Sequence, residues 1–85
     1  MRPFIRVGDT HTGGGEVLAG SPHMTFAGRK LARRGDPVSC PRHGRNEIVE
    51  GDAAFTDNGL PVALHGHRCA CGCTLIASLS QAGKA

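Results

Sequence analysis

The sequence lacks tryptophan and tyrosine altogether, and its only aromatic residues are three phenylalanines, Phe4, Phe26 and Phe55. Apolar residues make up only 39% of its 85 residues, so the core that they can bury is small. A chain of this length forms one domain, and a bound metal ion or an obligate partner would supplement so small a core. We therefore expect a single domain over residues 1–80 and a short polar tail over residues 81–85.

Long hydrophobic runs are missing as well. No window is apolar over the roughly 20 residues that a membrane-spanning helix needs. The N-terminal residues lack the apolar stretch of a secretory signal peptide. We therefore expect a protein that is made in the cytoplasm and does not leave the cell by the general secretory route.

A strong charge of either sign is also lacking. The chain has 10 Lys and Arg against 7 Asp and Glu. The basic residues are spread out and form no cluster interleaved with aromatic residues, which disfavours nucleic-acid binding. The acidic residues form no pair suited to acid–base catalysis, and the glycines at positions 13–15 are not followed by the Lys-Ser or Lys-Thr of a phosphate-binding loop. We expect neither an enzyme nor a nucleic-acid-binding protein.

Glycine and proline are abundant, with 13 and 5 residues that interrupt the whole chain. Such punctuation argues against long helices and favours short strands joined by turns. The segments that fit strands are residues 16–19, 24–26, 30–33, 46–50, 53–56, 61–64 and 74–78. Hairpin turns are expected at residues 27–28 and 57–59, because Asn-Gly and similar pairs supply the positive φ that tight hairpins need. The sequence predicts an all-β protein.

Three parts of the chain are similar to one another. Residues 20–35 reappear as residues 51–66, and a glycine followed by Asp or His recurs at Gly8, Gly35 and Gly66. An apolar pair lies nine and ten residues after the first and third glycines, but thirteen and fourteen after the second. The middle unit is therefore four residues longer, around Cys40 and His43. Because similar units can bury a hydrophobic face together but not alone, they predict a β body of pseudo-threefold symmetry.

Cysteine and histidine are concentrated in a few short stretches. Residues 65–73 hold two histidines and three cysteines, and a smaller cluster lies upstream at Cys40 and His43. Cysteines in a chain without a signal peptide favour reduced thiols, and hence a metal site over disulfides. Imidazole nitrogen and thiolate sulfur are the ligands that zinc prefers, and a closed set of four makes a structural site.

In a threefold body, the loops that follow the three glycines converge at one end. From these loops we predict a zinc site formed by His11, His43, His67 and Cys71. His43 is the only histidine in its loop, and His67 and Cys71 lie four residues apart across a tight loop. Cys71 also holds the place in the third unit that Cys40 holds in the second, so Cys40 remains an alternative to His11 or Cys71.

The other two cysteines, Cys69 and Cys73, are interpreted as small buried hydrophobic residues. A zinc ribbon with four sulfur ligands fits poorly. That fold needs two Cys-x-x-Cys pairs, and the chain has none.

These motifs resemble the PAAR-repeat proteins, which cap the spike of the bacterial type VI secretion system. The matching segments are residues 7–15, 20–22, 27–36, 38–44, 48–52, 61–63 and 65–77. The Pro-Ala-Ala-Arg signature that names the family is absent. Its places read Lys-Leu-Ala-Arg at residues 30–33 and Leu-Pro-Val-Ala at residues 60–63.

The resemblance implies a small cone of strands whose broad base binds a trimeric VgrG-type spike protein. One zinc ion, held by three histidines and one cysteine, would pin the tip, which agrees with His43, His67 and Cys71. Many relatives place a histidine where Gly13 stands. His11 must then reach the metal by a different loop path, or Cys40 replaces it.

The resemblance also implies a place of action. Such a protein would be present in the bacterial cytoplasm, be exported through the type VI secretion system and contact the target membrane transiently. Family members attach toxic effectors, often as fused domains. This chain ends at Ala85, so we expect no fused toxin. A separate effector or adaptor is therefore a candidate second partner. The alternatives are a small zinc-bearing adaptor or nucleic-acid-binding module and a small metal-dependent or thiol enzyme.

Overall fold

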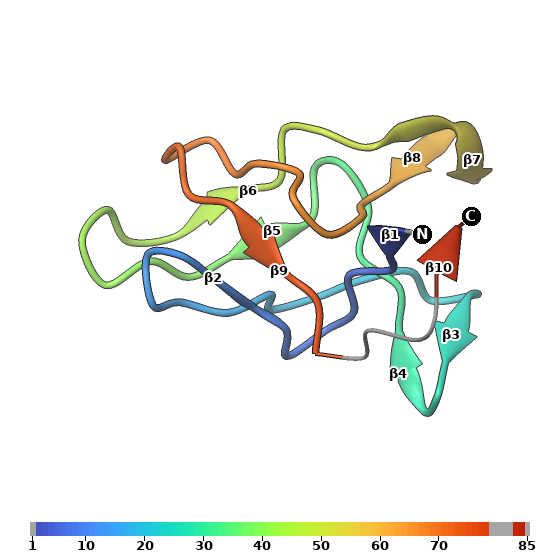
Figure 1. Ribbon diagram of the computed structural model, residues 1–85, viewed down its shortest axis with the longest axis horizontal. Helices are drawn as coiled ribbons and strands as arrows, with labels where there is room; N and C mark the ends of the chain where they lie inside the picture. The colour runs from blue at the N-terminus through green and yellow to red at the C-terminus, as the bar shows by residue number, and fades with distance from the viewer. Residues whose placement is uncertain (1, 79–82, 85) are drawn as a thin grey trace.

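The backbone of this protein folds into short pairs of antiparallel strands (Figure 1). The computed structural model describes residues 2–78 and 83–84, and within them it contains strands and turns but no helix. The strands are β1 (Arg2–Pro3), β2 (Thr10–His11), β3 (Thr25–Phe26), β4 (Arg29–Lys30), β5 (Pro37–Val38), β6 (Asn46–Glu47), β7 (Asp52–Asp57), β8 (Leu60–Val62), β9 (Leu75–Ile76) and β10 (Gly83–Lys84). The predicted all-β class is confirmed. No helix in the described residues could cross a membrane.

The strands form five antiparallel pairs: β1–β10, β2–β9, β3–β4, β5–β6 and β7–β8. The pairs β3–β4 and β7–β8 are hairpins closed by two-residue turns. Both turn residues have positive φ, at 51° and 83° for Ala27 and Gly28 and at 52° and 81° for Asn58 and Gly59. Two positive φ values give a turn whose twist matches that of the strands, so both predicted hairpins are confirmed.

A closed ring of backbone hydrogen bonds joins the three repeated parts of the chain. The N–H of Ile5 donates to the carbonyl of Ala63 at 3.0 Å, Ala63 donates to Ala32 at 2.9 Å, and Ala32 donates to Ile5 at 2.8 Å. All three residues are fully buried. The three parts therefore surround one axis, as the internal repeat predicts. We call them units one, two and three, beginning at Ile5, Ala32 and Ala63.

Each unit leaves the ring through the same tight turn. The N–H of the last turn residue, which is Asp9, Asp36 or His67, donates to the carbonyl three residues earlier at 3.0 Å. The residue before it is a glycine with a φ of 90°, 96° or 91°, which side chains with a Cβ avoid. The Gly-Asp and Gly-His pairs of the sequence are thus the structural start of each repeat.

The core is built from sets of three equivalent residues. One set is the ring itself, and a second comprises the apolar residues nine, thirteen and nine positions after the turn glycines: Val17, Ile48 and Leu75. The third set lies three positions after each glycine: His11, Val38 and Cys69. Members of the second and third sets pair across neighbouring units, so each unit completes the core of the next.

The body tapers along its longest axis, with extents of 31, 24 and 21 Å (Figure 1). Loops from the three units, residues 12–15, 39–45 and 70–73, gather at the narrow end, which we call the apex. The pairs β1–β10, β3–β4 and β7–β8 lie at the opposite, wide end, which we call the base. The predicted cone with pseudo-threefold symmetry therefore describes the fold.

The strand predictions differ in detail from the structure. The expected strands near β3, β4, β6, β7, β8 and β9 are present, whereas residues 16–19 make only isolated bridges. The strands β1, β2, β5 and β10, each two residues long, were not predicted. Within the predicted tail, Gly83 and Lys84 pair with β1, and residues 81, 82 and 85 lie outside the described residues. The domain boundary at residue 80 stays a prediction.

Ala27 is expected to destabilise its hairpin. Its φ of 51° brings the Cβ atom close to the following carbonyl oxygen, which is unfavourable for alanine. The equivalent residue of unit two is Asn58, and asparagine tolerates this conformation better because its side chain can form local hydrogen bonds. Ala27→Asn should therefore raise the free energy of unfolding by about 0.5–1 kcal/mol, measured by urea denaturation. The matched control, Asn58→Ala, should lower it by a similar amount. A loss of stability in Ala27→Asn would contradict this account.

Candidate metal centre

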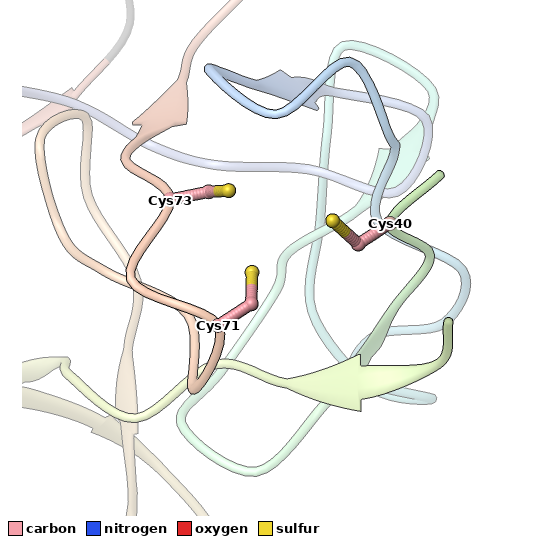
Figure 2. A group of neighbouring side chains, drawn as sticks. All are labelled: Cys40, Cys71 and Cys73. Carbon is pink, nitrogen blue, oxygen red and sulfur yellow. The ribbon is translucent and has the colours of Figure 1, made fainter. Parts of the chain in front are cut away.

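Three cysteine sulfurs converge at the apex. Cys40, Cys71 and Cys73 point toward one another, and their Sγ atoms all lie within 4.8 Å of one another (Figure 2). Cys40 is buried and the other two are half-buried. None of the four cysteines forms a disulfide. Among the described residues, this is the one group of three or more His, Cys, Asp or Glu side chains placed to hold a metal ion.

The repeat explains why two of these sulfurs meet. Cys40 lies five residues after Gly35, and Cys71 lies five residues after Gly66. The threefold ring therefore places Cys40 and Cys71 at the same level along the axis, on neighbouring units. Cys73 enters from the same loop as Cys71, beyond Gly72, whose φ of 89° turns the chain back. Its sulfur faces the loop of unit one, close to Gly13.

One imidazole reaches the sulfur cluster. The Nδ1 atom of His43 lies 3.4 Å from the Sγ of Cys40, and the His43 side chain is exposed. Both residues belong to the loop that is four residues longer than its counterparts, and this length turns His43 back toward Cys40. Three sulfurs and one nearby imidazole supply the number and type of ligand atoms that tetrahedral zinc takes.

The surroundings favour the thiolate at two of the three sulfurs. A hydrogen bond with His43 is the main cause that lowers the pKa of the Cys40 thiol. Burial of Cys71 opposes its ionisation, but hydrogen bonds from Cys73, Cys40 and Asn46 outweigh burial and lower its pKa as well. The pKa of Cys73 is raised, first by its hydrogen bond with Cys71. Because thiolate is the form that binds a metal, the cluster is partly prepared for one.

The fourth cysteine is of a different kind. Cys69 belongs to the hydrophobic core, and burial, followed by the neighbouring sulfur charges, raises its pKa to about 12. It therefore stays a neutral thiol, in agreement with its interpretation as a small buried hydrophobic residue. Cys73, which was interpreted in the same way, instead points into the cluster.

His11 connects two apex loops. Its Nδ1 accepts the N–H of Gly13 at 3.0 Å, so the proton sits on Nε2, which donates to the carbonyl of Ser39 at 2.6 Å. The side chain is only 2% exposed and takes the core position held by Val38 and Cys69 in the other units. Both of its ring nitrogens bond to the protein, which makes His11 a brace between units one and two.

His67 takes the place of an aspartate. Its Nδ1 accepts the N–H of Leu64 at 2.9 Å. The carboxylates of Asp9 and Asp36 accept the equivalent N–H groups at 2.9 and 2.7 Å in units one and two. The imidazole nitrogen thus completes the turn of unit three as a carboxylate oxygen does in the others.

The structure therefore divides the four residues predicted as zinc ligands. Cys71 lies in the sulfur cluster and His43 lies at its edge, whereas His11 and His67 lie outside it. Cys40, the alternative ligand, belongs to the cluster. Sequence reasoning missed Cys73, although its position two residues after Cys71, with a glycine between them, allows both to face one point. The predicted set itself stays a prediction.

Fold and site together define a class: a small all-β protein of three repeated units with a cysteine cluster at one end that can hold a metal ion. The family model described as PAAR motif matches residues 7–77, which is most of the chain. The chain therefore belongs to the PAAR-motif family. No curated protein is similar enough to the chain to count as a relative.

A substitution at His11 tests whether this residue braces two apex loops or binds the metal. His11→Val copies Val38 and leaves the Ser39 carbonyl without its partner, so the free energy of unfolding should fall by about 1–3 kcal/mol. The amount of zinc that the chain takes up when loaded with the ion, measured by elemental analysis, should not change. Val38→Ala is the control for an equal loss of core stability. Loss of zinc in His11→Val but not in Val38→Ala would show that His11 is a ligand.

A second substitution tests His67. His67→Asn keeps an acceptor for the Leu64 N–H, so we expect unchanged zinc content and a change in unfolding free energy below about 1 kcal/mol. His67→Ala removes the acceptor and should destabilise the turn without removing zinc. Loss of zinc from a folded His67→Asn variant, seen by elemental analysis with circular dichroism, would make His67 a ligand instead.

Proposed function

We propose that this protein is the zinc-stabilised tip that caps the trimeric VgrG-type spike of a type VI secretion system. Membership of the PAAR-motif family supports this role. The observation that carries it is the closed ring of Ile5, Ala32 and Ala63, because a body with threefold symmetry can seat on a threefold trimer. Each unit would then face one spike subunit.

The base has the side chains of a docking surface. All three aromatic residues of the chain gather there, with the ring of Phe4 centred 5.9 Å from that of Phe26 and 5.2 Å from that of Phe55. Phe26, on β3, is 41% exposed. Aromatic residues are enriched in protein interfaces and often dominate their binding energy. The base is therefore the face that we assign to the spike.

The sulfur cluster at the apex supports the proposed metal site. We propose that Cys40, Cys71, Cys73 and His43 hold one zinc ion, because soft thiolates and imidazole select zinc over hard cations. Four protein ligands close the coordination sphere, so the ion would act as a cross-link between units two and three and not as a catalyst. The narrow end contains the least core, and a cross-link there stiffens the part that meets a target surface.

The role that follows is mechanical. The protein would assemble with its spike in the bacterial cytoplasm, leave through the secretion system and contact the target membrane briefly. An effector or adaptor would be carried along as a further partner. The tip does this work by shape and stiffness, so we infer no enzymatic activity and no nucleic-acid partner.

Co-purification with the trimeric spike protein of the same organism tests this proposal. Phe26→Asp should abolish capture by the spike, because a charge would be buried in the interface. The matched control is Ile76→Asp on β9, which is 38% exposed and lies away from the base. It should bind as the unmodified protein does. No capture of the unmodified protein, or equal capture of both variants, would contradict docking through the base.

A further inference from the structure

The symmetry of the apex is broken at one corner. Gly13, Cys40 and Cys71 are equivalent, each lying five residues after the turn glycine of its unit. Units two and three place a sulfur at this position, and unit one has no side chain there. One ligand from each of the three units would surround a metal ion on the axis symmetrically. Because unit one has only a glycine at this position, a third ligand has to come from elsewhere in the chain.

Cys73 fills the space that unit one leaves. A Cβ atom added to Gly13 would lie 2.5 Å from the Sγ of Cys73, closer than such contacts come in proteins. The backbone of Gly13 is not in the left-handed region, since its φ lies outside the range that side chains avoid. The glycine is therefore required by the neighbouring sulfur and by the His11 ring, not by the conformation of the chain.

Backbone contacts hold the two positions together. The N–H of Thr12 donates to the carbonyl of Thr74 at 2.9 Å, and the N–H of Thr74 donates to the Oγ1 of Thr12 at 3.0 Å. These bonds join the residues next to Gly13 and Cys73. On the other side, the Cys69 N–H donates to the Cys73 carbonyl at 2.9 Å and closes the loop that contains Cys71.

We propose that Cys73 is a transferred ligand: unit three supplies two sulfurs, and the second replaces the ligand that unit one lacks at Gly13. The inference rests on the metal site proposed above. It also makes positions 13 and 73 interdependent, because a side chain at position 13 would occupy the space that the Cys73 side chain fills. A cysteine at position 13 and a cysteine at position 73 should therefore substitute for each other.

A double-mutant cycle tests this exchange on the full chain, with Cys73→Ala, Gly13→Cys and the combination of both. Zinc affinity is measured by competition with a chromophoric chelator. Thiolate ligands are followed by the sulfur-to-cobalt absorption band of the cobalt-loaded protein, which grows with the number of bound thiolates. Cys69→Ala is the matched control, since it removes a buried thiol outside the cluster.

Cys73→Ala should weaken zinc binding by more than about 100-fold, because losing an outer-shell partner alone costs about 10- to 100-fold. Its cobalt band should fall from that of three thiolates to that of two. The double variant should regain the full band and come within about 10-fold of the original affinity, after small shifts of the His11 ring. Cys69→Ala should keep both readouts unchanged.

If the double variant does not fold, Gly13→Ala gives the same answer. It should weaken zinc binding in the original chain by displacing Cys73, and have no further effect in Cys73→Ala. Unchanged affinity and band in Cys73→Ala would overturn the inference and leave the metal site standing. A folded double variant with no recovery would overturn the exchange with Gly13. If the original chain bound no zinc, the proposed metal site would fail, and the inference with it.

Discussion

Three backbone hydrogen bonds, among Ile5, Ala32 and Ala63, are the constraint on which this structure depends. They join segments that are far apart in the sequence into a ring, and each ring segment leads into the same glycine turn. The turn fixes the direction in which every unit leaves the axis. Convergence of the apex loops, and with it the sulfur cluster, therefore follows from backbone geometry before any metal is considered.

A frame held by backbone bonds lets equivalent side chains differ. The turn needs only an acceptor for one N–H, and either a carboxylate or the imidazole of His67 provides it. The core position below the apex accepts Val38, Cys69 or the hydrogen-bonded ring of His11. The apex could thus lose one symmetric position and gain Cys73 nearby without a change in the fold.

The sequence was informative wherever one residue type has one physical use. Turn glycines, the Asn-Gly hairpin and the spacing of apolar pairs predicted the repeat, the hairpins and the fold. Histidine was less informative, because its nitrogens serve a metal and a backbone N–H equally well; only the structure shows His11 and His67 bonded to the backbone. Cys73 was missed because it lies outside the repeated position, where the repeat offers no guide.

The apex loops are already tied to one another by the chain itself. His11 bonds to Ser39, Thr12 bonds to Thr74, and the Cys71 N–H donates to Asn46 at 3.3 Å, so every pair of units is linked. In zinc fingers, by contrast, the ion organises an otherwise unfolded peptide. Here the loops that carry the three sulfurs are already held together by the protein, so little ordering entropy would oppose metal binding. Binding and loss of a metal ion at these sulfurs would then be local events that leave the body of the protein unchanged.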